Sequence, residues 1–448
     1  MDKTTVQAWV LNSNAEWVEK IEGTDFTVNR TTGVITFTTA PGVTPIDGED
    51  NVKILAYKTF EGYSDRVRRC TFGTLFGVNG ASDRVFLSGN SDYPNYDWYS
   101  GQNDPTYFPD TGYSQLGLEI SAIVGYSLVN NYLAAHKDSN EPSQSVFIRE
   151  GDLITREITT STGAKSEVSD PAFKLINTLQ GSPALSPYSF GYVETEPLFL
   201  TEKGIFALTT QDITGDKYGQ NRSFYLNGQL LEEPNLKNAY CCVYDNMYYL
   251  AVNNKVYLLD GLQATRTDRS DPYSTRQYVG YVWNNIPATI LFEDEGHLFF
   301  GTVDGKICQF YDDVDALDSY NDDGYPIDAW WETPDLDGKL FYKNKTFRYY
   351  AARLMAAIAT SVKMWAMKAG AWTLVKTDNA TGRYFDFGNI NFEKFSFSTD
   401  QTEKVVHTKI KVKKVDKARF KLENDALNEP FGLFNIALEY VENGNYKG

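Results

Sequence analysis

The sequence is poor in the residues that most often bind metals or form cross-links. It has four cysteines and three histidines among 448 residues. The cysteines form no CxxC pair, and two are adjacent, which indicates neither a disulfide framework nor a zinc knuckle. No HExxH motif occurs, and the histidines lie far apart. We therefore expect reduced thiols and no zinc site. The residues are Cys70, Cys241, Cys242, Cys308, His136, His297 and His407.

A long apolar segment is also missing. The most hydrophobic window, residues 354–367, is shorter than a bilayer span and contains Lys363. The first residues, MDKTTVQAWVLNSN, have no basic segment followed by an apolar core, so no secretory signal is expected. These absences predict a chain with no membrane contact.

Motifs for catalysis are absent as well. No GxSxG elbow occurs, and residues 301–307 fall one residue short of a phosphate-binding loop and end in Ile. A glycosidase needs only two well-placed carboxylates, for which Asp97, Asp245, Asp294 and Glu332 are candidates. Nothing in the sequence places two of them across a sugar. The sequence therefore predicts a chain that is not an enzyme, with no catalytic residues and no cofactor.

Acidic and aromatic side chains are abundant. Asp and Glu number 59 against 42 Lys and Arg, a formal net charge of −17. Such a charge favours solubility and argues against coating nucleic acid with the whole surface. Aromatic residues make up 15% of the chain and suit half-buried pleated surfaces and interfaces. The composition predicts β structure with extensive contacts.

A repeat is visible in the middle of the chain. The segment NMYYLAVNNKVYLLDG, residues 246–261, has two apolar runs around an Asn-Asn turn, which predicts a β-hairpin. Similar hairpins occur fifty residues before it and fifty residues after it, in residues 197–210 and 297–313. A period of about 50 residues built from hairpins is typical of β-propeller blades.

Two weaker copies precede these hairpins, around Phe86 and around Tyr132. The larger gap after Tyr132 contains the polar segment TSTGAKSEVSDP, residues 160–171, which predicts a loop-like insertion. The alternative is an ordinary β-sandwich with evenly spaced hairpins. The fixed period favours the propeller, because regular spacing discriminates better between the two. We predict an all-β, propeller-like fold.

Changes in composition divide the chain into three parts. Residues 1–65 predict a small N-terminal β module with a hairpin in residues 25–41. Residues 66–338 predict the β-propeller-like domain. Residues 339–448 predict a β-rich region that either completes the propeller or forms a β-sandwich.

The propeller-like part ends in an acidic stretch. Residues 311–338 contain nine Asp and one Glu, with no Lys or Arg. Calcium prefers several carboxylate and carbonyl oxygens, but the closest EF-hand register starts at Ser319 and has Trp330 where the bidentate Glu is needed. This mismatch favours a solvated acidic loop, and no metal site is predicted.

A basic stretch lies near the C-terminus. In HTKIKVKKVDKARFKLEND, Ile410 and Val412 alternate with lysines until Lys414 and Val415 break the register, which predicts one apolar and one basic strand face. Two interpretations stay open: contact with DNA phosphates, for which support is weak, or a solvated strand whose lysines prevent edge-to-edge pairing. The candidate basic face comprises Lys409, Lys411, Lys413, Lys414, Lys417, Arg419 and Lys421.

A group of aromatic residues in residues 93–108 is a candidate surface for contact with other proteins. The alternative is that the same rings pack between neighbouring blades, and the sequence does not decide between the two. The members are Tyr93, Tyr96, Trp98, Tyr99, Tyr107 and Phe108.

Three segments resemble a known family. They are DRVFLSGNSDYPNYDWYSGQNDPTYFPD (residues 83–110), EPLFLTEKGIFALTT (residues 196–210) and KARFKLENDALNEPFGLFNIALEYVENGNYKG (residues 417–448). Across most of its length the chain is similar in texture and short motifs to virion structural proteins of tailed bacteriophages and prophages, of the type described as packaged-DNA stabilisation or tail-hub β-propeller proteins.

This resemblance implies a head-tail connector or tail-hub component that plugs or stabilises the packaged-DNA channel. It implies a virion location after assembly in the bacterial host cytoplasm, in a homo-oligomeric ring that contacts portal, tail or adaptor proteins. The competing class is a tail-tip receptor- or glycan-binding protein. A glycan-binding protein should show a concave aromatic pocket with convergent Asp and Asn, whereas a connector should show subunit contacts on opposite faces.

Overall fold

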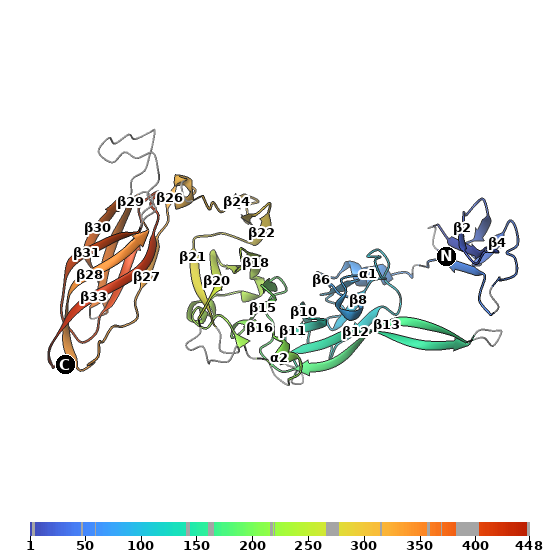
Figure 1. The fold of residues 1–448 in the computed structure, drawn as a ribbon, viewed down its shortest axis with the longest axis horizontal. Helices are drawn as coiled ribbons and strands as arrows, with labels where there is room; N and C mark the ends of the chain where they lie inside the picture. Colours follow the sequence, from blue (N-terminus) through green and yellow to red (C-terminus); the bar gives the residue numbers. More distant parts are fainter. Residues whose placement is uncertain are drawn as a thin grey trace. The chain divides into compact units, whose positions relative to one another are not determined.

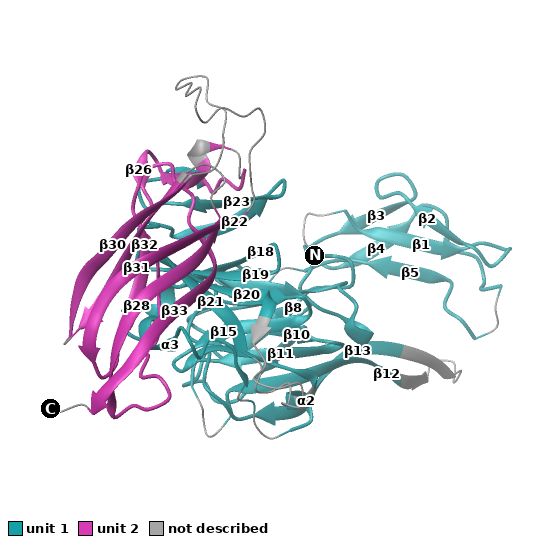
Figure 2. Ribbon diagram, turned by 60° about the vertical axis from the view of Figure 1, so that its left-hand side comes forward, with its two compact units in different colours: residues 1–308 teal, residues 309–448 magenta. Residues whose placement is uncertain are grey.

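The computed structural model describes residues 1–445 except residues 2–4, 46–47, 59, 140–143, 160–164, 216–217, 219, 266–276, 314–315, 356–358, 369 and 382–402. The chain divides into two compact units, Met1–Cys308 and Gln309–Gly448 (Figure 2). Both units are built from antiparallel strands. Within the described ranges, no helix is long and apolar enough to cross a membrane.

The first unit begins with a small module of two sheets. One sheet has the order β2 (Trp17–Lys20), β1 (Gln7–Leu11), β5 (Val52–Leu55), and the other pairs β3 (Phe26–Asn29) with β4 (Val34–Phe37). The predicted hairpin in residues 25–41 is thus confirmed. Val6, Ala8 and Phe26 form a separate core under these sheets.

Five antiparallel sheets follow, which we number as the first to the fifth blade (Figure 1). Each has its strands in chain order, as in a β-propeller, and the first four have four strands and the fifth has three. The first two blades are β6 (Phe72–Leu75), β7 (Val85–Ser88), β8 (Tyr96–Tyr99), β9 (Tyr113–Gln115), and β10 (Ile123–Val129), β11 (Tyr132–Lys137), β12 (Val146–Thr159), β13 (Lys165–Leu179). The other three are β14 (Gly191–Val193), β15 (Glu196–Thr201), β16 (Gly204–Ala207), β17 (Gln220–Asn221), then β18 (Tyr240–Tyr244), β19 (Met247–Val252), β20 (Lys255–Thr265), β21 (Gln277–Asn284), then β22 (Ile290–Asp294), β23 (His297–Gly301), β24 (Ile307–Gln309).

Short helical turns connect these strands. The α-helices are α1 (Tyr63–Arg68), α2 (Thr210–Ile213) and α3 (Asn227–Leu230), and the 3-10 turns are η1 (Val78–Gly80), η2 (Leu236–Asn238) and, in the second unit, η4 (Leu317–Tyr320).

The predicted repeat is confirmed as the second strand of successive blades. The three aligned runs fall in β15, β19 and β23, and the weaker copies at Phe86 and Tyr132 fall in β7 and β11. Two of these strands are apolar because they are covered on both faces: all residues of β15 are buried, as are all but the first of β19. The period therefore reports the position of the second strand of each blade, which is almost fully buried in the second, third and fourth blades.

Consecutive blades share their cores. Phe86 of the first blade packs with Tyr126 and Phe147 of the second, and Val146 of the second packs with Phe199 of the third. Leu198 of the third blade packs with strands of the fourth in the same way. The first four blades thus bury faces against their neighbours, as the propeller prediction requires.

The prediction of a loop-like insertion in residues 160–171 is wrong for the part that the structure describes. Residues 165–171 continue β13, which pairs with β12 from Gly151↔Phe173 to Thr159↔Lys165, while residues 160–164 lie outside the described residues. β11 pairs with β12 only up to Glu150. Beyond that point the two strands form a hairpin that extends from the second blade (Figure 1). A side chain at Gly151 would meet the carbonyl oxygen of Gly77 at 2.3 Å, so glycine permits the close approach there.

The second unit is a β-sandwich of two sheets. One has the order β27 (Ala329–Glu332), β32 (Arg419–Asn424), β29 (Ala359–Lys368), β30 (Ala371–Thr381), and the other β31 (Lys404–Val415), β28 (Lys343–Met355), β33 (Gly432–Asn445). A short pair, β25 (Asn321–Asp322) and β26 (Tyr325–Pro326), precedes them. The two sheets enclose one core that includes Phe347, Met364 and Phe420. Of the two alternatives for residues 339–448, the sandwich is the observed one.

Both predicted domain boundaries shift. The boundary at residue 338 moves to Cys308, because β27 pairs with β32 and so belongs to the sandwich. The boundary at residue 65 falls inside α1. Asn90 of the first blade donates to the carbonyl oxygen of Arg66 at 2.8 Å, so this helix is part of the first blade.

Candidate binding cleft on the first blade

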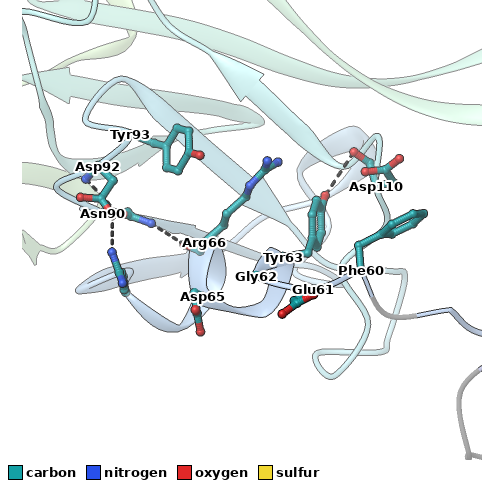
Figure 3. A pocket seen from close by; sticks show the side chains of 11 residues that line it. Phe60, Glu61, Gly62, Tyr63, Asp65, Arg66, Asn90, Asp92, Tyr93 and Asp110 are labelled. Carbon is teal, nitrogen blue, oxygen red and sulfur yellow. Dashed lines mark hydrogen bonds and ion pairs between the residues drawn. The ribbon is translucent and has the colours of Figure 1, made fainter.

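A cleft of about 520 Å³ lies between α1 and the loops of the first blade (Figure 3). It is bounded by the segment before α1, by α1 itself, by the turn between β7 and β8, and by the loop that precedes β9. Its lining residues are Phe60, Glu61, Gly62, Tyr63, Asp65, Arg66, Arg69, Asn90, Asp92, Tyr93 and Asp110.

Arg66 holds the two aromatic walls of this cleft. Its guanidinium carbon lies 5.0 Å from the ring centroid of Tyr63 and 5.4 Å from that of Tyr93. Figure 3 shows the side chain extending between the two rings. A guanidinium group over an aromatic face is attracted by the ring quadrupole, so both rings are fixed in place.

The short helix α1 is anchored to the blade at both ends. Gly62 precedes it with a φ of 75°, a left-handed conformation that residues with a side chain rarely adopt. The Tyr63 hydroxyl donates to the carbonyl oxygens of Pro109 and Asp110, each at 3.2 Å. Burial, and then the Asp110 carboxylate, raise the pKa of this hydroxyl, which keeps it protonated as a donor.

The acidic groups of the cleft differ in their availability. Asp92 forms an ion pair with Arg69. Asn90 is buried, and both ends of its side-chain amide are hydrogen-bonded within the protein. The amide nitrogen donates to the carbonyl oxygen of Arg66, and the amide oxygen accepts from the Asp92 backbone N–H at 2.9 Å. Three exposed carboxylates, those of Glu61, Asp65 and Asp110, have no ion-pair partner among the described residues. They are the free hydrogen-bond acceptors of the cleft.

The six aromatic residues predicted as one contact surface are divided between surface and core. Trp98 is only 2% exposed and packs edge-on against Tyr93 and stacked on Tyr96. A buried ring cannot contact another protein, so Trp98 is removed from the predicted surface. Tyr93 lines the cleft, and Tyr96 is half-buried beside Tyr113.

The remaining three have different surroundings. Tyr99 stacks on Phe86 at 5.3 Å and lies 4.8 Å from Phe173 of the second blade, which is the blade-packing alternative. Tyr107 is exposed and contacts Tyr57. Phe108 is half-buried. Some residues of the aromatic stretch therefore lie at the surface, and others pack between neighbouring blades.

The candidate basic face is divided as well. Ile410 and Val412 are buried while Lys409, Lys411 and Lys413 are exposed, so the predicted alternation in β31 is confirmed. Lys414, with a φ of 53°, breaks the register as predicted. β31 is an edge strand of its sheet, which fits the anti-pairing interpretation.

The other three basic residues do not extend this face. Arg419 and Lys421 belong to β32 in the opposite sheet, and Lys417 lies two residues before Arg419, where that strand begins. Lys417 and Arg419 pair with Asp335, and Lys421 pairs with Glu423. These ion pairs neutralise the charges that the prediction assigned to phosphate contact.

Two of the four candidate carboxylates are engaged in ion pairs. Asp97 is buried in an ion pair with Arg149, and Glu332 pairs with Arg419 in the second unit. Asp245 and Asp294 lie at the ends of strands in the fourth and fifth blades. Within the described ranges, no group of three or more potential metal-ligating side chains is present.

The aromatic and basic residues before Tyr93 were missed by the sequence reasoning. A six-residue helix is too short for apolar periodicity to show. The available signal was Gly62 followed by Asp65 in the first helical turn and Arg66 and Arg68 in the last, a charge order that favours a helix.

Comparison with known proteins gives little further guidance. No protein-family model matches the sequence, and no curated protein matches it. Among solved structures, the chain is similar to three of an exo-β-1,3-galactanase from Phanerochaete chrysosporium, two of variants with β-1,3-galactotriose and one with galactose. The sequence identities are 9%, 10% and 11%, the TM-scores 0.25, 0.23 and 0.23, and the matches cover 82% of this chain and 96% of the other.

The prediction that the chain is not an enzyme is contradicted by this comparison, because all three structures are of a glycoside hydrolase. That prediction is withdrawn. TM-scores this low do not transfer an active site or a substrate to the chain.

Proposed function

We propose that the chain is a virion protein of a tailed bacteriophage that binds carbohydrate in the cleft of the first blade. The virion part rests on the resemblance of residues 83–110, 196–210 and 417–448. The carbohydrate part rests on one observation: aromatic rings and unpaired carboxylates line the same cleft.

A sugar fits this combination for a chemical reason. A pyranose ring has an apolar C–H face that packs on an aromatic ring, and hydroxyls at its edge that donate to carboxylates. Phe60, Tyr63 and Tyr93 supply the rings, while Glu61 and Asp110 supply acceptors. The volume of about 520 Å³ is typical of small-ligand sites.

The charge of the lining narrows the class of sugar. Its carboxylates, on Glu61, Asp65, Asp92 and Asp110, outnumber its guanidinium groups, on Arg66 and Arg69. Like charges repel at short range, so sulfated and phosphorylated glycans are disfavoured. Neutral oligosaccharides and amino sugars are the expected ligands.

Replacing Phe60 by Ala is expected to weaken sugar binding about tenfold, or about 1.4 kcal/mol. Phe60 is 51% exposed, so its loss removes a stacking surface without opening the core. Calorimetric titration of the full chain with neutral hexasaccharides of differing linkage measures the effect. Tyr225→Ala, at a 65% exposed ring outside the cleft, is the matched control and should bind as the parent does.

Two results would overturn the proposal: no hexasaccharide binds at millimolar concentration, or Phe60→Ala and Tyr225→Ala bind equally. Chromatography of the same mixtures after incubation shows whether the sugars are also cleaved. Release of shorter sugars that is lost in Phe60→Ala would assign turnover to this cleft as well as binding.

A second proposed function is assembly in a homo-oligomeric ring with portal, tail or adaptor proteins. It is supported by exposed apolar side chains of β12 and β13 at the base of their hairpin, since such surfaces on soluble proteins are typical of interaction sites. These side chains are Leu153, Ile154, Leu175 and Ile176.

Light scattering of the purified chain is expected to give the mass of a ring of fixed copy number, alone or with the portal protein. Leu153→Asp should reduce that mass to the monomer, because a charge at an apolar contact is desolvated without a partner. Val303→Asp, at an exposed site in the fifth blade, is the control. A monomeric parent chain that ignores the portal protein would end this proposal.

A further inference from the structure

The sheet β27-β32-β29-β30 of the second unit has one face in the sandwich core and one face turned away from that core. Val362, Met364 and Ala366 of β29 are buried in the core. Because side chains alternate along a strand, Lys363 and Trp365 lie on the outward face.

Strand register brings three tryptophans onto this outward face. Trp365 of β29 lies opposite Lys421 of β32 and Leu374 of β30. Trp330 of β27 lies opposite Glu423 of β32. Trp372 lies opposite Met367, two positions further along β29. We call the set Trp330, Trp365, Trp372 and Leu374 the tryptophan face.

The tryptophan face is accessible and held in place. Trp330 is 46% exposed and Leu374 is 45% exposed, while Trp365 and Trp372 are half-buried. The Trp365 indole donates to Glu423 at 2.6 Å. The Lys421 ammonium lies 5.3 Å from the Trp365 ring and 6.0 Å from the Trp372 ring.

The charged groups among these rings are already paired. Lys421 pairs with Glu423 at 2.6 Å, and Arg419 pairs with Glu332 at 3.0 Å. Lys363 pairs with Asp425. The outward face is therefore electrically balanced, in contrast to β31, where no ion pair to Lys409, Lys411 or Lys413 occurs within the described ranges.

We propose that the tryptophan face is a second carbohydrate site that takes a neutral oligosaccharide lying across β27, β32 and β29. It extends the proposed carbohydrate binding to the second unit and does not depend on the cleft of the first blade. Trp330 and Trp365 flank β32 opposite Glu423 and Lys421, so about 10 Å across the strands and about 7 Å along them separate the two positions. That distance accommodates two sugar rings, one on each indole.

The balanced charges select this occupant over others. An apolar partner would bury the Lys421–Glu423 pair with no new hydrogen bonds, which is unfavourable. A polyanion needs unpaired cations, and the cations here are neutralised by carboxylates. Sugar hydroxyls can use the lone pairs that remain on the paired carboxylates while the rings cover the indoles.

The test is a titration of the full chain with cellohexaose, laminarihexaose and maltohexaose, followed by calorimetry and by tryptophan fluorescence. We expect two sites per chain and a fluorescence shift. Trp330→Ala should remove one site, with at least a tenfold loss of affinity there, and should reduce the shift. Trp17→Ala, at a ring exposed to 47% in the N-terminal module, is the matched control and should retain both sites.

The outcomes separate this site from the cleft. Phe60→Ala should weaken binding at the other site about tenfold and leave the fluorescence shift. If Phe60→Ala abolishes all binding while Trp330→Ala changes nothing, the tryptophan face is not a sugar site and the cleft proposal stands. If the reverse holds, the cleft proposal fails alone. Binding of a sulfated hexasaccharide but of no neutral one, or unchanged binding in a folded Trp330→Phe and Trp330→Ala pair, would also overturn the inference.

Discussion

Replacing Asp97 by Asn is expected to lower the free energy of unfolding of the first unit by about 3–5 kcal/mol. Asp97 of the first blade and Arg149 of the second are both fully buried and form a two-pronged ion pair. The Tyr126 hydroxyl donates to Asp97 at 3.0 Å, and Arg149 donates to Ser114 at 3.1 Å. Asn keeps the shape but leaves the guanidinium charge uncompensated in the interior.

The protonation of Arg149 follows from the same contacts. Burial acts to lower the pKa of its guanidinium, but the Asp97 carboxylate, Tyr126 and Tyr99 together outweigh burial, and the pKa is raised. The charge on Arg149 persists when Asp97 is removed, because an arginine guanidinium stays protonated in proteins. This arrangement also explains why Asp97 is unsuited to the acid-base role that the sequence left open for it.

Calorimetry of the full chain measures the effect as a fall in the melting temperature of the first unit, with the transition of the second unit unchanged. Asp152→Asn is the control, because Asp152 pairs with Lys174 at 3.6 Å and both side chains are exposed. It should cost less than about 1 kcal/mol. A double replacement, Asp97→Leu with Arg149→Met, should recover much of the loss. A loss under about 1 kcal/mol in Asp97→Asn would mean that the pair is not desolvated.

Acid is expected to destabilise the first unit through His136, by about 2 kcal/mol between pH 7 and pH 5. Its ring is fully buried, with centroids 4.3 Å from Phe199 and 5.1 Å from Phe190. The Nε2 atom lies 2.8 Å from the Ser127 hydroxyl, and Nδ1 has no partner in the described part of the chain. Burial lowers the pKa of His136 from 6.5 to about 3.

The sign follows from which state binds more protons. Between pH 6.5 and about 3 the unfolded chain is protonated at His136 and the folded chain is not. The stabilisation is therefore complete above pH 6.5 and falls by about 1.4 kcal/mol for each unit below it. His136→Gln should flatten the dependence of the first-unit melting temperature on pH, measured as a difference from the parent chain. Parallel curves for the two proteins would rule His136 out as its source.

The sequence was sufficient to predict the blades but not the contacts between them. Fully buried strands such as β15 and β19 show as apolar runs whatever packs on them, so their spacing is visible. The Asp97–Arg149 pair joins residues 52 positions apart. Nothing in the sequence around either residue distinguishes it from a charged residue exposed to solvent. Only the packing of two blades brings those charges together.

The candidate site shows the same limit. Tyr93 was found because aromatic residues cluster around it, yet neighbouring Trp98 is buried, since both faces of β8 are covered in part. The tryptophan face combines Trp330 and Trp365 from strands that only the sheet order makes near neighbours. In β31, where one face meets solvent, alternation alone gave the correct faces for Ile410 and Val412.

The β12–β13 hairpin is an arm of the second blade, and its length can change without a change in the blade. Eight residue steps separate Gly151 from Thr159, so the described arm reaches roughly 26 Å beyond the blade. Adding one residue to each strand would lengthen it by about 3.3 Å and turn over the faces of everything beyond, whereas adding two to each would lengthen it by about 7 Å and preserve them. Insertions of two residues in each strand can therefore change the distance between the second blade and a partner bound at the end of the hairpin, while the blade itself is unchanged.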